Sequence, residues 1–283
     1  MKQNNYIIRT MTREEVNIAI DWAAKEGWNP GLHDAECYYL TDPNGFLIGL
    51  LDGEPIATLS VVKYGAAFGF LGFYIVHPKY RGQGYGLKIW EAGIHYLKGC
   101  NIGLDGVVEQ QANYKKFGFK LAYRNIRFEC FGCDNLPTNA NVITLSQVPF
   151  EAIEQYNQSF FPAKRTAFMN AWINQPDCKA LGIIQNDHLV GYGVMRKALN
   201  GYKVGPLYAD NPAYANAIFA SLIQAVDPLQ PVYLDIPEVN QEALTLAEHY
   251  NMKKVFETAR MYTGELQDLL LDQLYGVTSF EVG

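Results

Sequence analysis

The residues best suited to chemistry form a short segment of glycines with one arginine, Arg81-Gly82-Gln83-Gly84-Tyr85-Gly86. The segment follows the apolar run Phe68 to Val76, which predicts a buried strand, and opens a stretch with helical spacing that reaches about Lys98. The first amides of a helix have no partner within the helix, and glycines let an anion approach them without meeting a Cβ atom. The arginine adds a charge that can contact a phosphate oxygen. The segment therefore predicts a pyrophosphate-binding loop.

Two common phosphate-binding patterns are excluded. The loop of nucleotide hydrolases needs Gly-Lys followed by Ser or Thr, and no such residues follow these glycines. The segment is also not a dinucleotide fingerprint, because that pattern would need Gly-x-Gly-x-x-Gly early in a βαβ unit and an acidic residue about twenty positions later. On the glycines alone, a tight strand-to-helix turn without a ligand remains an alternative.

The context of the loop resembles one family. Arg81-x-x-Gly84-x-Gly86 follows Val76-His77-Pro78, and the segment Asn113-Tyr114-Lys115-Lys116-Phe117-Gly118-Phe119 lies downstream. In this strand order the two motifs resemble the acetyl-coenzyme A (acetyl-CoA) signature, and the tyrosine before a Gly-Phe turn, of the GNAT superfamily of N-acetyltransferases. The resemblance covers the chain from Tyr6 to about Phe131.

The resemblance implies a sheet whose fourth and fifth strands splay apart to hold acetyl-CoA as a co-substrate. It places the thioester arm against the backbone of the fourth strand, and it makes Tyr114 the acid at the leaving thiolate. The residues that it implies for cofactor binding are Ile75, Val76, His77, Arg81, Gly82, Gln83, Gly84, Tyr85, Gly86 and Asn113.

The sequence leaves the general base open. The strand Phe68 to Val76 carries no Glu, Asp or His, so the glutamate that many family members place there is absent. Asp105 ends the next predicted strand and Glu109 lies one turn later, so both are catalytic candidates. A water relay, or selection of already deprotonated amine from solution, is an alternative.

Other residues concern the acceptor. His33 and Asp34 lie in the segment that usually borders the acceptor in this family, and we predict that they bind it. Trp22, Trp28 and the run Cys37-Tyr38-Tyr39 could line an acceptor pocket, but the expectation for them is packing on helical faces.

The order of predicted elements occurs twice along the chain. In the first half it is β-α-α-β-β-β-α-β-α-β, and a similar order follows a polar, turn-rich segment at residues 132–141. The residues that align between the halves are Leu104-Asp105 with Leu234-Asp235, Arg127 with Arg260, and Gly72-Phe73 with Gly205-Pro206. The chain therefore resembles a tandem GNAT protein, a mixed α+β fold. Each copy is predicted to have a mostly antiparallel sheet with splayed fourth and fifth strands, flanked by helices.

The second copy lacks the phosphate-binding loop. In place of Arg81 to Gly86 it has Asn211-Pro212-Ala213-Tyr214-Ala215-Asn216, without glycine or arginine. We therefore predict that residues 1–135 form the acetyl-CoA-binding domain and that residues 136–283 form a degenerate copy on the acceptor side. Asp235, the counterpart of Asp105, is a predicted acceptor contact.

Composition limits the class of protein. Of the 283 residues, 49% are hydrophobic and 18% are charged, which is typical of a globular protein. No apolar run is long enough for a membrane span. The formal net charge of -6 argues against a nucleic-acid partner, because neutralising phosphates requires a basic excess. Five cysteines at irregular spacing predict a reducing, cytoplasmic location, and Cys130 and Cys133 lack the second pair that a metal site would need.

The prediction for function is an acetyl-CoA-dependent N-acetyltransferase. It would transfer an acetyl group to a primary amine of a small molecule or peptide, by direct attack in a ternary complex. The alternative is a non-catalytic sensor that binds acyl-CoA, and turnover with any amine would distinguish the two. An aminoacyl transferase of the Fem type, which duplicates the same fold, is disfavoured by the intact coenzyme A loop and by the acidic chain. The sequence is compatible with a homodimer.

Overall fold

The computed structural model describes residues 5–134, 136, 139–266 and 268–283. Two turn signals in the sequence, Asp52-Gly53 and Asn186-Asp187, are confirmed as the turns of β-hairpins. Both Asp52 and Asn186 have positive φ, at 50° in each case, which short polar residues tolerate better than most.

The first half follows the predicted order. Its elements are β1 (Tyr6–Thr10), α1 (Val16–Lys25), α2 (Asp34–Thr41), β2 (Phe46–Leu51), β3 (Glu54–Tyr64), β4 (Phe68–Val76), α3 (Tyr85–Tyr96), β5 (Asn101–Val107), α4 (Gln111–Lys116) and β6 (Lys120–Phe131). The bounds of β4 and β6 are those that the sequence predicted.

The second half repeats the order and adds one short strand, β13, after it. Its elements are β7 (Val142–Thr144), α5 (Phe150–Asn157), α6 (Thr166–Asn174), β8 (Cys178–Gln185), β9 (His188–Lys197), β10 (Tyr202–Ala209), α7 (Pro212–Ile223), β11 (Pro231–Pro237), α8 (Gln241–His249), β12 (Lys253–Tyr262) and β13 (Leu274–Gly276). The predicted domain boundary after residue 135 falls at a residue outside the described ones, and that boundary stays a prediction.

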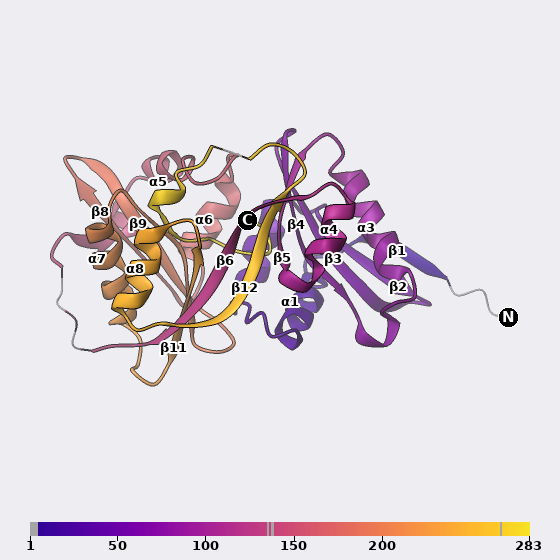
Figure 1. Ribbon diagram of the computed structural model, residues 1–283, viewed down its shortest axis with the longest axis horizontal. Helices are drawn as coiled ribbons and strands as arrows, with labels where there is room; N and C mark the ends of the chain where they lie inside the picture. Colours follow the sequence, from indigo (N-terminus) through magenta and orange to yellow (C-terminus); the bar gives the residue numbers. More distant parts are fainter. Residues whose placement is uncertain (1–4, 135, 137–138, 267) are drawn as a thin grey trace.

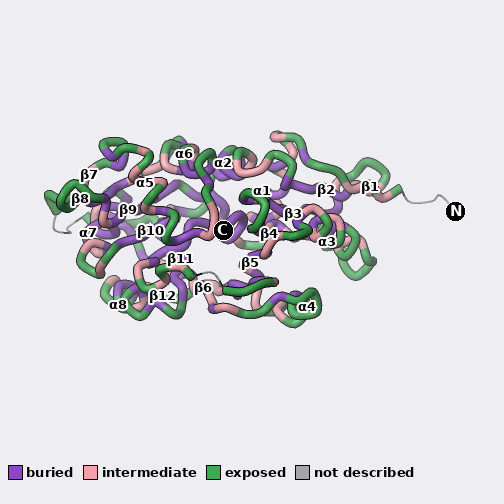
Figure 2. Tube along the Cα trace, turned by 90° about the horizontal axis from the view of Figure 1, so that it is seen from above, coloured by how far each residue is buried: buried purple, intermediate pink, exposed green. Residues whose placement is uncertain are grey.

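The strands of both halves join in one continuous sheet. Among the described residues it has thirteen strands, in the order β1-β2-β3-β4-β5-β12-β6-β11-β10-β9-β8-β7, with β13 paired to β10. One face is covered by α1, α2, α5 and α6, which share a single hydrophobic cluster, and the other face carries α3 with α4 and α7 with α8. Figure 2 shows α2 and α6 on one side of the strands and α4 and α8 on the other.

The two halves exchange their last strands. β6 does not pair with β5; it pairs with β11 of the second half, while β12 lies between β5 and β6. Figure 1 shows β6 and β12 side by side where the halves meet. The sequence predicted the last strand of each half, β6 and β12, but not this exchange. Alternating apolar residues predict a strand but do not specify which strand it pairs with.

β4 and β5 pair as parallel strands only from Phe68 opposite Asn101 to Leu71 opposite Leu104, and each then continues without the other. In the second half, β10 and β11 also pair only over three residues, from Tyr202 to Val204. The splay of the fourth and fifth strands, predicted from the family resemblance, is therefore present in both copies.

The last described residues cross from the second half into the first. After β13, residues 277–283 are all buried, and their end lies near the centre of the molecule (Figure 1). Arg165, itself buried on the second half, donates to the carbonyl oxygen of Gly283 at 2.6 Å. We call residues 277–283 the inserted tail.

Candidate active site

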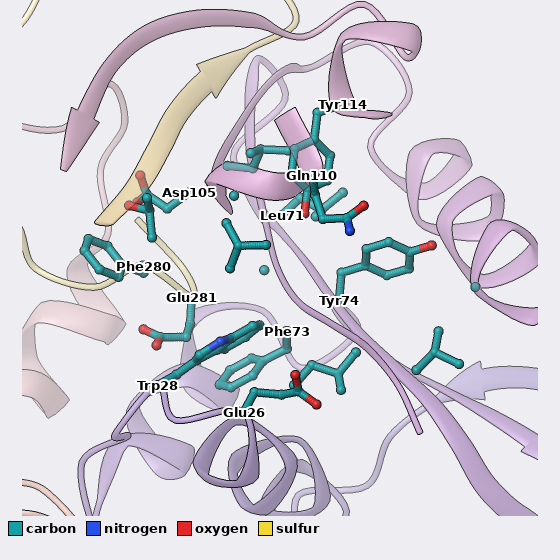
Figure 3. Close-up of a pocket in the computed structure, with 18 of the residues that line it drawn as sticks. Glu26, Trp28, Leu71, Phe73, Tyr74, Asp105, Gln110, Tyr114, Phe280 and Glu281 are labelled. Carbon is teal, nitrogen blue, oxygen red and sulfur yellow. The ribbon is translucent and has the colours of Figure 1, made fainter. Parts of the chain in front are cut away.

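A cavity of about 540 Å³ opens between the splayed strands β4 and β5. In Figure 3, Trp28, Asp105, Phe280 and Glu281 gather at one end of this cavity, and Tyr74, Gln110 and Tyr114 lie toward the other. The volume falls within the range of small-molecule sites, about 300–1,000 Å³. The cavity is lined by residues from both halves, including Phe256 and Thr258 of β12.

A bulge in β4 shapes the wall of the cavity. Two residues of β4, Phe73 and Tyr74, stand opposite one residue of β3, and Phe73 has a φ of 45°. The Thr58 hydroxyl donates to the carbonyl oxygen of Phe73 at 2.9 Å, which fixes the bulge. Because β4 has no strand partner on the β5 side beyond Leu71, its backbone groups there are open to a ligand.

The glycine loop forms the outer wall and begins α3. Gly82 and Gly84 have φ of 74° and 86°, a conformation that disfavours other residues, and no heavy atom lies within 4 Å of where a Cβ would stand on either. Arg81 is half exposed, donates through Nε to the Val76 carbonyl at 2.8 Å and forms an ion pair with Glu26. Space for an anion therefore exists beside free helix amides and a guanidinium.

Tyr114 reaches the cavity from α4. Its ring stacks on Trp90, with centroids 5.7 Å apart and planes at 23°, and a Cβ on Gly106 would stand 2.2 Å from its Cε2 atom. Burial raises the pKa of Tyr114 well above its usual value, so the hydroxyl stays protonated at neutral pH and can donate a proton.

The predicted cofactor residues divide into two groups. Those that line the cavity are Ile75, Val76, Arg81, Gly82, Gly84 and Gly86. His77, Gln83, Tyr85 and Asn113 are not among its lining residues. The His77 amide donates to the Ile56 carbonyl at 2.9 Å, and the Asn113 side chain bonds within its own helix region, so neither group is directed to the cavity by these contacts.

Of the two predicted bases, only Asp105 lines the cavity. Arg260 of β12 donates to both of its carboxylate oxygens, at 2.9 and 2.6 Å, and Asn125 donates to one of them at 2.8 Å. A proton taken by Asp105 would therefore break a buried ion pair, which is costly. Glu109 is exposed and is not a lining residue.

Asp235 lies behind the cavity rather than in it. It binds Arg127 through both oxygens, at 2.7 and 2.8 Å, as the counterpart of the Asp105–Arg260 pair. The guanidinium of Arg127 stands 5.6 Å from the ring centre of Phe256 and 5.2 Å from that of Phe280, and donates to the Trp28 carbonyl at 2.9 Å. Asp235 thus supports three aromatic residues that do line the cavity.

His33 and Asp34 also lie outside the cavity lining. His33 is 3.1 Å from an Asp177 carboxylate oxygen, and the fully buried Asp34 pairs with Arg196 at 2.8 Å. Both contacts join the two halves of the chain. In the structure these two residues connect the halves, and a role in binding the acceptor stays a prediction.

The sequence did not predict several lining residues, among them Trp28, Phe280 and Glu281. Trp28, expected to pack on a helical face, lines the cavity, so that expectation was wrong. Phe280 and Glu281 arrive with the inserted tail. No local sequence pattern predicts a tail that crosses into the other half. The many apolar residues between Leu274 and Val282 could have suggested that this segment is buried.

The second splay is filled by the protein itself. β13 pairs with β10 at Leu207 and Tyr208, and the amide of Val277 donates to the Asp235 carbonyl of β11 at 2.9 Å. A Cβ on Gly205 would stand 2.5 Å from the Val277 carbonyl oxygen, so the tail passes directly over this strand. The second copy therefore has protein where the first has a cavity.

Comparison with known families finds one match in each half of the chain. Residues 13–119 match the acetyltransferase (GNAT) family, and residues 153–276 match an acetyltransferase (GNAT) domain. The chain belongs to the GNAT superfamily, with two GNAT domains. It is an acyltransferase of the GNAT type, and enzymes of this type use acyl-CoA.

Several similar proteins align with nearly the whole chain. The holothin acyltransferase of Pseudoalteromonas sp. (strain SANK 73390) is 29% identical over 270 residues, which are 95% of this chain and 92% of the relative. The crystal structure of a Pyrococcus horikoshii protein assigned as an acetyltransferase has a TM-score of 0.84 at 23% identity, covering 98% of this chain and 96% of that one. A tandem GNAT protein from the clavulanic acid biosynthesis pathway has a TM-score of 0.63 at 12% identity, covering 93% and 100%. The two structures establish the tandem fold.

No helix in the described part of this GNAT protein is both long and apolar enough to cross a membrane.

Proposed function

We propose that the protein transfers an acetyl group from acetyl-CoA to a primary amine on a small molecule, in the cavity between β4 and β5. The observation that carries the proposal is the meeting of three features in one cavity: the bulged backbone of β4, which has no partner on its β5 side beyond Leu71, the open glycine loop and the Tyr114 hydroxyl. Each answers one requirement of acyl transfer from a thioester.

The residues present fit an acyl-CoA. A side chain at Gly84 would fill space that a pyrophosphate needs, whereas the glycine leaves the first amides of α3 accessible. Arg81 would hold a phosphate oxygen, and the backbone of Ile75 and Val76 would pair with the pantetheine arm as a neighbouring strand does. When bound, acyl-CoA supplies the thioester carbonyl that the amine attacks.

The remaining chemistry belongs to the chain. Backbone amides at the Phe73 bulge would donate to the carbonyl oxygen, and one such donor contributes on the order of 3 kcal/mol to catalysis. Tyr114 donates a proton to the leaving sulfur, which its raised pKa permits because the hydroxyl is protonated at neutral pH.

The acceptor end favours a small amine with a flat, apolar body. Trp28, Phe256 and Phe280 present aromatic rings there, and Arg127 holds all three through its contacts. A cavity of about 540 Å³ that also receives the end of the pantetheine arm leaves room for a small molecule. The similarity to a holothin acyltransferase supports an acceptor of this size.

The test is release of free coenzyme A from acetyl-CoA in the presence of aromatic amines, aliphatic amines, amino acids, polyamines, peptides and holothin. We expect thiol release that depends on an aromatic or heteroaromatic primary amine and gives the N-acetylated product by mass spectrometry. Binding of acetyl-CoA without release by any amine would contradict the proposal and favour an acyl-CoA sensor.

A further inference from the structure

The inserted tail brings a carboxylate to the cavity. The carbonyl oxygen of Glu281 lies so close to β4 that a Cβ on Gly72 would stand 2.2 Å from it, and the Ser60 hydroxyl donates to the same oxygen at 3.1 Å. Glu281 therefore lies beside Phe73, the bulge residue of β4. The strand that lacks an acid of its own receives one from the far end of the chain.

One oxygen of this carboxylate is fixed and the other is free. Oε2 lies 2.9 Å from the Tyr38 hydroxyl and 2.8 Å from the Ser279 hydroxyl, both of which can donate to it. No donor from the described residues reaches Oε1. Glu281 is 3% exposed and lines the cavity, so its position is set by packing and by these hydrogen bonds.

The other buried acids near the meeting of the halves are already paired. Each has an arginine on its carboxylate: Asp34 with Arg196, Asp105 with Arg260, and Asp235 with Arg127. Within the described ranges, Glu281 has no cation within 4 Å in an ion pair. A base needs an unengaged lone pair, and among these four acids Glu281 alone has a carboxylate oxygen that accepts from no donor of the described residues.

We propose that Glu281 is the general base of the acyl transfer. The acceptor ammonium loses one proton to Oε1, and the nitrogen lone pair then forms the C–N bond. The C–S bond breaks with its electron pair on sulfur, and Tyr114 protonates the sulfur. The second proton lost by nitrogen restores Tyr114 through solvent, and Glu281 returns its proton to solvent.

This inference rests on the proposed function, and the replacement Glu281→Gln tests it separately. Glutamine keeps an oxygen for Tyr38 and Ser279 but cannot take a proton. We expect kcat to fall about 100-fold or more while the affinity for acetyl-CoA, measured by calorimetry, is unchanged. The loss should shrink as the pH approaches the pKa of the acceptor, because free amine then needs no base.

The wild type and the Glu281→Gln variant differ in one titratable group, the Glu281 carboxylate. The other charged or titratable groups that interact electrostatically with Glu281 are Tyr38, Asp105, Arg127, Arg196 and Lys203, and all are the same in both proteins. Glu248→Gln, an exposed position on α8, is the matched control and should keep wild-type turnover. If the glutamine variant does not fold, Glu281→Asp is the second variant, because it keeps a carboxylate that can take a proton. A folded aspartate variant should keep measurable turnover with the wild-type direction of pH dependence, whereas a loss that is the same at every pH would overturn the inference.

The outcomes separate the two proposals. If the wild type turns over and a folded Glu281→Gln variant is equally active, the role of Glu281 is overturned and the proposed function stays intact. A loss that is the same at every pH, or that comes with lost acetyl-CoA binding, assigns Glu281 a structural role only and also overturns the inference. Absence of wild-type turnover with every amine overturns both.

Discussion

Replacing Gly72 with alanine should displace the inserted tail. The added Cβ would stand 2.2 Å from the Glu281 carbonyl oxygen and 2.9 Å from its carbonyl carbon and Cα atom. Since close carbon–oxygen contacts are about 3.3 Å or longer, the tail must move by about 1 Å. These are backbone atoms, so no side-chain rotation relieves the contact.

The magnitude follows from that shift. Overpacking of a buried site costs about 1–3 kcal/mol, and in a chain of this length about 1 kcal/mol lowers the melting temperature by roughly 2–4 °C. A displacement of about 1 Å in a reacting group can cost about 100-fold in rate. We therefore expect Gly72→Ala to melt several degrees lower and to lose turnover about as severely as Glu281→Gln.

The assay pairs thermal unfolding with amine-dependent thiol release. Gly53→Ala is the control, because Gly53 has a positive φ of 92° but no heavy atom within 4 Å of the Cβ position. It should lose about 1 kcal/mol of stability from backbone strain and keep normal turnover. A Gly72→Ala protein with wild-type melting and wild-type kcat would refute the argument that the tail is seated on β4 as part of the active site.

Three further predictions concern other parts of the molecule. Gly84→Val should weaken acetyl-CoA binding at least about 10-fold by calorimetry, because it adds a branched side chain at a φ of 86° where the phosphates would lie; unchanged affinity in a folded variant would contradict the loop assignment. Tyr114→Phe should lower kcat about 100-fold with little change in acetyl-CoA affinity, and equal turnover would remove Tyr114 from the mechanism. Burial, together with the nearby Arg127 guanidinium, lowers the pKa of Lys203 to about 8. Between this value and the unfolded pKa of 10.5, the unfolded chain binds more protons than the folded chain, so the free energy of unfolding rises with pH. Relative to Lys203→Met, the wild-type free energy of unfolding should therefore rise by about 2 kcal/mol from about pH 7 to about pH 9.5, and parallel curves for the two proteins would show that Lys203 titrates normally.

The sequence was sufficient for the order of the elements and for the glycine loop that lines the cavity. Apolar runs without interruption gave β4 its bounds, because a strand buried on both faces needs no polar alternation. Glycine and arginine types predicted the loop before α3, because its backbone conformation, with positive φ at Gly82 and Gly84, restricts the residues allowed there. The alignment of Arg127 with Arg260 is also explained by the structure, since each arginine pairs with the aspartate of the opposite half.

The end of the cavity at Trp28, Phe280 and Glu281 could not be predicted, because it depends on long-range pairing. The exchange of β6 and β12 determines which residues of β12, Phe256 among them, face the cavity, and nothing within either strand specifies its neighbour. Asp105 was predicted as a base and Asp235 as an acceptor contact, but the exchange brings an arginine to each. Glu281 reaches β4 only because the tail crosses the molecule, a path that local patterns do not encode.

The most direct test of the account is the number of acetyl-CoA molecules that one full-length chain binds, measured by titration calorimetry. A cavity opens between β4 and β5, and β13 fills the corresponding space of the second half. We predict a stoichiometry of one acetyl-CoA per chain, lost in Gly84→Val. Two molecules per chain, or one that binds the Gly84→Val protein with unchanged affinity, would contradict it.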